Sequence, residues 1–141
     1  MLDTAANFIE ELRRINWKYR EPQQLDNGKV AVSCGINGKS SHYDMHFFFD
    51  EDNHSVCIRV FQLLRVPIDK KFQVMELINQ LNGNYRWVKF YTNAEDDVNV
   101  QTDAIISPEN SGKVTVELMV RTFRVIDEIY PKFMHAIWSE A

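Results

Sequence analysis

The stretch DKKFQVMELINQLNGNYRWVKFYTNAEDDVNVQT, residues 69–102, decides the fold that the sequence predicts. Apolar residues recur in its first half at a spacing of three, which we interpret as the buried stripe of a helix: Phe72, Met75, Ile78 and Leu81. Asp69 is placed to cap this helix, and Gly83 to end it. The aromatic run 85–91 predicts a strand, and alternating residues after the polar turn 93–97 predict another: Val98, Val100 and Thr102. We therefore expect a helix followed by an antiparallel hairpin.

The residues before this stretch predict one helix and three strands. Residues 5–15 follow the helical period. Residues 20–29 predict an irregular connection, because they contain Pro22 and the turn pair Asn27-Gly28. Three runs of alternating side chains, each bounded by a turn, then predict strands over 29–36, 42–50 and 55–66.

The end of the chain predicts one long helix after the loop 107–112. Its apolar residues lie on one stripe: Val116, Met119, Phe123, Ile126, Tyr130, Phe133 and Ile137. Pro131 falls inside this pattern and removes a backbone donor, at a cost of about 3 kcal/mol where the site does not accommodate it. Because the apolar period continues beyond Pro131, we expect a kink there rather than the end of the helix.

The elements follow one another as helix, three strands, helix, two strands, helix (α-β-β-β-α-β-β-α). Short turns or a single helix join the strands, which favours antiparallel pairing. We therefore expect an α+β fold of two layers, in which helices cover one face of a five-stranded, mainly antiparallel sheet. A chain of 141 residues is expected to form a single domain over residues 1–141.

Composition excludes several classes of protein. Hydrophobic residues make up 45% of the chain, which favours a globular core. The net charge is -4 and no run of lysine or arginine stands out, which disfavours binding to nucleic acid or to an anionic membrane. No apolar run of about 18 residues predicts a transmembrane helix. The acidic, amphipathic first residues do not resemble a signal peptide, so a cytoplasmic location is expected.

One set of side chains has the chemistry of a metal site. His42, Asp44 and His46 alternate along a predicted strand and share one face, and imidazole with carboxylate suits zinc or another transition metal. The alternative function is therefore a small-molecule or metal-dependent enzyme that uses this face. Alternation alone explains the three residues as a polar outer face, so we expect no metal and no cofactor. The acidic turn 50–53 departs from the pattern of a calcium loop and is expected to be a hairpin turn. The acidic turn 95–97 is expected to be solvated, and its clustered carboxylates could weakly attract a cation.

Alternation also divides the apolar residues of the early strands between two faces. One phase is expected to face the core: Val30, Val32, Tyr43, Met45, Phe47, Val56, Ile58 and Val60. The opposite phase still carries apolar side chains, and together with one tryptophan from a later strand they form the candidate partner-binding set: Phe48, Phe61, Leu63 and Trp87. If the helices cover one face only, this set lines an open face, and an exposed apolar patch usually marks an interaction surface. The alternative is that a helix, such as the piece after Pro131, covers this face.

Three motifs in the second half of the chain resemble the bacterial YbjN-like proteins. They are Glu76-Leu77-Ile78-Asn79-Gln80-Leu81-Asn82, Lys89-Phe90-Tyr91 before an acidic turn, and Ile126-Asp127-Glu128-Ile129-Tyr130-Pro131. The resemblance covers roughly residues 69–138, and the first half fits by the order of its elements. That family is similar in fold to the type III secretion chaperones, which are typically dimers that bind extended segments of other proteins. It is labelled a sensory-transduction regulator and has no agreed catalytic residues.

The resemblance implies a bacterial cytoplasmic protein without enzymatic activity. Together with the candidate open face, it favours a protein-binding module, chaperone-like or regulatory, whose partner is another protein or a protein segment. The dimeric chaperones and an aromatic content of 12% suggest a homodimer.

Overall fold

The computed structural model of the protein describes residues 1–139. Its three α-helices are α1 (Asp3–Arg14), α2 (Lys71–Asn84) and α3 (Ser111–Trp138), and a short 3-10 turn, η1 (Ile68–Lys70), precedes α2. Its six strands are β1 (Gln23–Gln24), β2 (Val30–Asn37), β3 (His42–Phe49), β4 (Ser55–Arg65), β5 (Lys89–Thr92) and β6 (Asp97–Ile105). None of the helices in this described part of the chain is both long and apolar enough to span a membrane.

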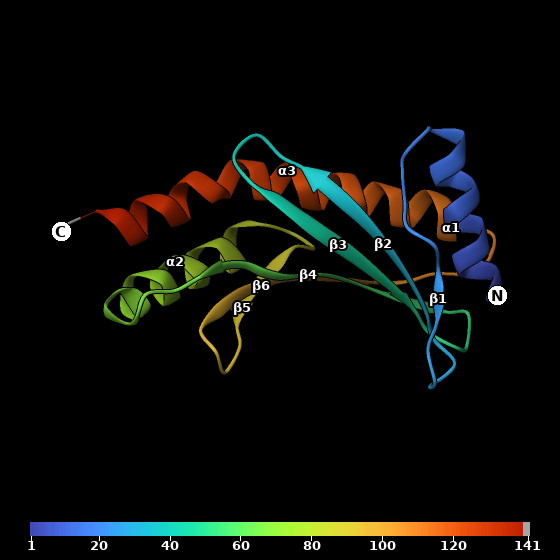
Figure 1. Ribbon diagram of the computed structural model, residues 1–141, viewed down its shortest axis with the longest axis horizontal. Helices are drawn as coiled ribbons and strands as arrows, with labels where there is room; N and C mark the ends of the chain where they lie inside the picture. Colours follow the sequence, from blue (N-terminus) through green and yellow to red (C-terminus); the bar gives the residue numbers. More distant parts are fainter. Residues whose placement is uncertain (140–141) are drawn as a thin grey trace.

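The strands form one open antiparallel sheet in the order β1-β2-β3-β4-β6-β5. Figure 1 shows α3 running along most of the sheet, with α1 near one end and α2 near the other. The α+β class and the antiparallel pairing are confirmed, but the expected number of five strands is wrong. The sixth strand, β1, lies in the segment expected to be an irregular connection and pairs Gln23 with Ala31 and Gln24 with Val30. Two exposed glutamines have no apolar alternation that could have predicted it.

The core lies between one face of the sheet and the helices. The predicted core phase is confirmed: its members are buried, apart from Tyr43, which is half-buried. On α1, Phe8 packs its ring against those of Phe47 and Phe49, with centroid distances of 4.6 and 5.5 Å. On α3, Phe133 packs edge-on against Phe90 at 5.7 Å. We call this the covered face of the sheet.

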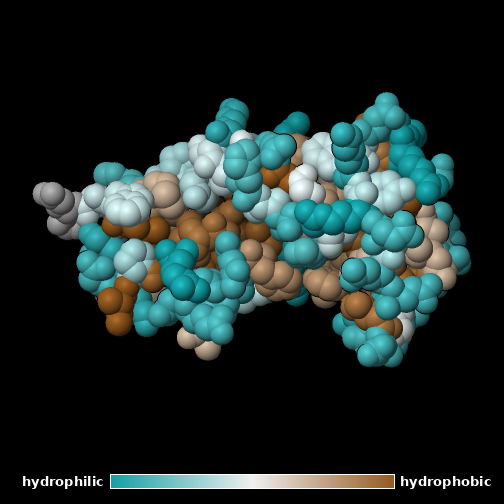
Figure 2. All heavy atoms as spheres, in the orientation of Figure 1, coloured by the Kyte–Doolittle hydropathy of each residue, from teal (hydrophilic) through white to brown (hydrophobic). Residues whose placement is uncertain are grey.

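The predicted stripe of α2 is only half correct. Ile78 and Leu81 are buried together with Val74, but Phe72 is 76% exposed and Met75 is 50% exposed. A strict spacing of three drifts by about 60° per step around a helix of 3.6 residues per turn, so four such residues cannot share one face. In Figure 2, apolar surface is gathered in the half of the molecule that contains α2 and the end of α3.

The ends of α2 also differ from expectation. Asp69 lies within the 3-10 turn rather than at a cap, and Gly83 lies inside the last helical turn. The predicted strand 85–91 is shorter, because β5 begins only at Lys89. The residue two positions earlier, Trp87, has a left-handed backbone (φ 68°), which interrupts an extended chain.

The last helix, α3, runs through Pro131 without ending, as the continued apolar period predicted. Its expected stripe is confirmed, with Met119, Ile126, Phe133 and Ile137 buried, and Val116, Phe123 and Tyr130 half-buried. Because Phe133 contacts Phe90 of β5, the piece after Pro131 packs on the covered face. It therefore does not fold over the opposite face of the sheet.

Candidate functional site

The face of the sheet opposite the helices carries a cluster of three rings. Phe48 and His46 are contributed by β3, and Phe61 by β4. The ring centroid of Phe61 lies 5.6 Å from that of His46 and 6.4 Å from that of Phe48. Phe61 is 46% exposed, and the other two side chains are half-buried. We call these three residues the aromatic cluster and this face the open face.

The segment that contains β1 borders the aromatic cluster. With the cluster it lines a hollow of about 470 Å³, whose other lining residues are Arg20, Glu21, Gln23, Leu25, Ala31 and Ser33. Arg20 fixes this segment to the sheet, since its backbone N–H donates to the Ser33 carbonyl and its guanidinium lies 2.6 Å from the Asp44 carboxylate. The sequence did not predict that this segment lines a hollow, because Pro22 and the Asn27-Gly28 turn indicated only an irregular connection.

His46 is held in the hollow by the facing strand. Ser33 lies opposite His46 in the β2–β3 register, and the Ser33 hydroxyl is 2.7 Å from His46 Nδ1. Burial lowers the pKa of His46, an effect that the Asp44 carboxylate opposes and Arg20 reinforces. The neutral imidazole is therefore favoured, and its Nδ1 shares a hydrogen bond with the Ser33 hydroxyl. The cluster thus presents two phenyl rings and one uncharged imidazole.

The proposed metal-ligating residues do not converge. His42 and Asp44 do share one face of β3 with His46, as predicted, but each binds a different neighbour. His42 Nδ1 lies 2.9 Å from the Asn37 amide oxygen, and Asp44 pairs with Arg20. No group of three or more histidine, cysteine or acidic side chains in residues 1–139 is placed to hold a metal ion. The geometry gives the metal-dependent alternative no ligand set in that part of the chain.

The second acidic turn is less solvated than expected. Asp97 begins β6 and is only 2% exposed. Its carboxylate lies 3.4 Å from Arg65 Nε, and the Asn93 side-chain amide accepts the Asp97 backbone N–H. Asp97 is therefore a structural residue of the β5–β6 hairpin.

The two cysteines lie on opposite faces of the sheet and are both free thiols. Cys34 is buried on the covered face, and Cys57 is half-buried on the open face. Burial raises the pKa of Cys34 to about 11 and also raises the pKa of Cys57. Since the thiolate is the nucleophile, neither thiol is activated for covalent chemistry.

Leu63 is not on the exposed surface, contrary to expectation. The β4–β6 register shifts between Val60 and Leu64, and Gln62 in this bulge has a left-handed backbone (φ 56°). The Gln62 N–H donates to the Asn99 side-chain oxygen at 2.8 Å, which holds the bulge against β6. Leu63 is consequently only 9% exposed. A bulge changes the phase of a strand, and nothing in the pattern of residues 55–66 predicted it.

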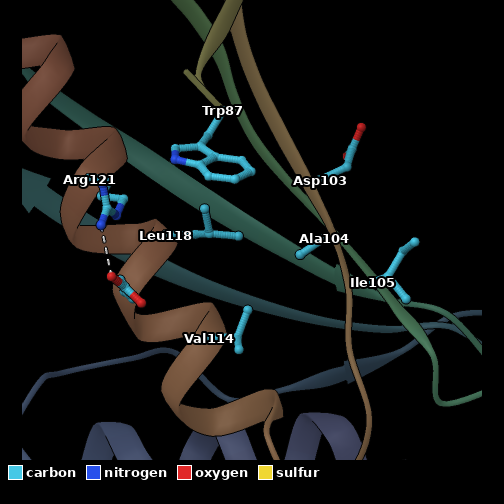
Figure 3. Close-up of a pocket in the computed structure, with 8 residues that line it drawn as sticks. Trp87, Asp103, Ala104, Ile105, Val114, Leu118 and Arg121 are labelled. Atoms are coloured by element: carbon cyan, nitrogen blue, oxygen red, sulfur yellow. Dashed lines mark hydrogen bonds and ion pairs between the residues drawn. The ribbon is translucent and has the colours of Figure 1, made fainter. Parts of the chain in front are cut away.

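Trp87 lies apart from the aromatic cluster. Its indole, 54% exposed, lies between α3 and the end of β6. There it lines a groove of about 450 Å³ together with Asp103, Ala104, Ile105, Val114, Glu117, Leu118 and Arg121 (Figure 3). Ala104 is in register with Val56, so this groove is on the helix side of the sheet. The four predicted binding residues thus occupy three different places.

Comparison with known protein families identifies the family of the chain. Residues 4–137 match the model of the family YbjN, described as "Putative bacterial sensory transduction regulator". No curated protein and no solved structure matches the chain.

Proposed function

Because the chain belongs to the YbjN family of bacterial regulators, we propose that it regulates by binding another protein on the open face of its sheet, without catalysing a reaction. The observation that carries this proposal is the aromatic cluster of His46, Phe48 and Phe61. Aromatic side chains that stay exposed on a folded chain are typical anchors of protein interfaces. The bordering hollow adds Leu25 as an apolar wall.

The fold supports the same proposal. Apart from the two-residue β1, the elements follow the order helix, three strands, helix, two strands, helix. We propose that this arrangement is of the type III secretion chaperone kind, whose members the sequence resembles through its family. The raised pKa values of both cysteines and the dispersed partners of His42 and Asp44 support binding over chemistry.

A second copy of the chain is the first partner to test. Replacing Phe61 by serine removes the most exposed ring of the cluster, while the covered face stays intact. We expect the parent protein to elute as a dimer in gel filtration with light scattering at micromolar concentration, and the Phe61→Ser variant as a monomer. Phe72→Ser is the matched control, because Phe72 is exposed on α2 and should leave the mass unchanged.

A monomeric parent over the whole concentration range would remove the homodimer, and the partner would then be a different protein. If the Phe61→Ser variant is still a dimer, the chain self-associates through a surface other than the open face.

A further inference from the structure

The outer edge of β6 is unpaired over its C-terminal part. β5 begins at Lys89, in register with Gln101, and β6 continues beyond this point to Ile105. The backbone of residues 102–105 therefore has β4 on one side and no strand on the other side among residues 1–139. The groove described above occupies the position that a longer β5 would fill (Figure 3).

Backbone polarity shows which groups face the groove. On the β5 side, the Asp97 carbonyl accepts the Asn93 N–H, whereas Ile106 donates its N–H to His54 on the β4 side. Backbone groups of successive strand residues point to alternate sides. The odd-numbered residues, Asp103 and Ile105, therefore direct their N–H and C=O groups to the unpaired side. An extended chain laid there would form backbone hydrogen bonds with both.

The chain turns away sharply before β5, at Trp87. The Val88 N–H donates to the Arg86 carbonyl at 2.7 Å, and Trp87 between them has φ 68°. Such a left-handed conformation costs a bulky residue about 1–3 kcal/mol, and strain of this size is commonly kept at binding sites. Because of this turn β5 begins only at Lys89, and the indole lies beside the groove (Figure 3).

The outer edge of β5, by contrast, is covered by a side chain. The Asn82 side chain covers the outer edge of β5, donating to the Phe90 carbonyl at 2.9 Å and accepting the Phe90 N–H at 2.8 Å. A side-chain amide thus imitates a paired strand there. The described chain provides no such cover for Asp103 and Ile105.

The groove is apolar at one end and basic at the other. Beside Ala104 and Ile105, α3 contributes Val114 and Leu118. Beyond Trp87, an adjoining hollow of about 470 Å³ is lined by Tyr85, Arg86, Trp87, Glu117, Val120, Arg121, Arg124 and Val125. Arg121 pairs with Glu117 at 2.9 Å. Arg86 and Arg124 also line this hollow, so the charges of its lining residues sum to a positive value.

We infer that this groove binds an extended segment of a partner protein, which adds to the sheet as a short strand beside residues 102–105 of β6. An antiparallel strand, as everywhere else in this sheet, runs in the direction of β5, from Ile105 toward Trp87. Its residue opposite Ala104 points toward α3 and should be apolar. The residues that follow reach Arg86 and Arg124 and should be acidic, because opposite charges attract across such interfaces.

A second copy of this chain fits the groove poorly. The free edge is four residues long, whereas a stable interface buries about 800 Å² on each partner. A flexible segment can enter between α3 and β6 without bringing a folded domain with it. This groove is separate from the open face. The effect of Phe61→Ser on dimerisation therefore does not test whether the groove binds a peptide.

Selection from a library of displayed random short peptides tests the inference with the full chain as bait. We expect the enriched peptides to carry an apolar residue followed, toward their C-termini, by acidic residues. The binding of a labelled enriched peptide is then measured by fluorescence anisotropy. Replacing its acidic residues by lysine should weaken binding by about tenfold or more, since tenfold corresponds to 1.4 kcal/mol.

Two variants of Ile105 separate backbone pairing from side-chain contact. Ile105→Pro removes the N–H that faces the groove and leaves the β4 pairing of Ala104 intact, because proline is tolerated at a strand edge. Ile105→Val keeps that N–H. We expect Ile105→Pro to weaken the peptide about tenfold and Ile105→Val to leave its affinity within about twofold. Arg124→Glu, an exposed change on α3, should weaken the acidic peptide and not its lysine version.

Three results would overturn the inference. The first is that the selection enriches no peptide sequence. The second is that enriched peptides bind Ile105→Pro as tightly as the parent. The third is that light scattering shows a parent dimer that becomes a monomer in Ile105→Pro, because a second copy would then occupy the groove.

Discussion

Replacing Phe47 by serine should lower the free energy of unfolding by roughly 3–5 kcal/mol, whereas the same change at Phe61 should cost about 1 kcal/mol or less. Phe47 is fully buried on the covered face, where its ring packs 4.6 Å from that of Phe8. Serine would leave a cavity and bury a hydroxyl without a partner. Phe61 is on the neighbouring strand but on the open face, and is 46% exposed. Urea denaturation of both variants and the parent measures the difference.

The pair compares one residue type on the two faces of one sheet. A Phe61→Ser protein destabilised as strongly as Phe47→Ser would mean that the open face is covered. The aromatic cluster would then belong to a core, and the proposed binding face would be lost.

Replacing Phe133 by alanine should cost a similar amount, roughly 3–5 kcal/mol. Phe133 is fully buried after Pro131 in α3 and packs edge-on against Phe90 at 5.7 Å. Aromatic pairs of this kind contribute about 0.5–1.5 kcal/mol beyond the burial of their area. Thermal and chemical denaturation would measure the loss.

Phe72→Ala is the control for Phe133→Ala. Phe72 is 76% exposed on α2, so its truncation should change stability by about 0.5 kcal/mol or less. If Phe72→Ala and Phe133→Ala lost equal free energy of unfolding, Phe72 would have to be buried. The observed placement of α2 would then be wrong, and the stripe predicted from the spacing of three would be correct.

The sequence predicted the parts of the fold whose periodicity is regular. Strict alternation in β2, β3 and most of β4 identified the covered face, because each successive side chain of a strand reverses direction. The long stripe of α3 was equally clear, and it continues through Pro131. In α2, by contrast, four residues spaced three apart suggested a single buried face. From the first to the last of them, their side chains rotate by about 180° around the helix axis, so they do not share one face.

The candidate sites depend on backbone features that leave no periodic signal. The bulge at Gln62 buries Leu63, and the left-handed Trp87 moves its indole to the helix side of the sheet. Neither residue is a glycine or asparagine, the usual sign of such a conformation. The groove beside β6 requires Ala104 and Leu118 to meet, and only the packing of α3 brings them together.

The most direct test of the proposed function is photo-cross-linking from the open face in living bacteria. The photoreactive amino acid p-benzoylphenylalanine would replace Phe61 in one variant and Phe72 in the other, since both are exposed phenylalanines on different surfaces. We expect a discrete cross-linked product from position 61, at the mass of a dimer or of a complex with another protein, and none of that mass from position 72. No product from position 61, or the same product from both positions, would contradict it.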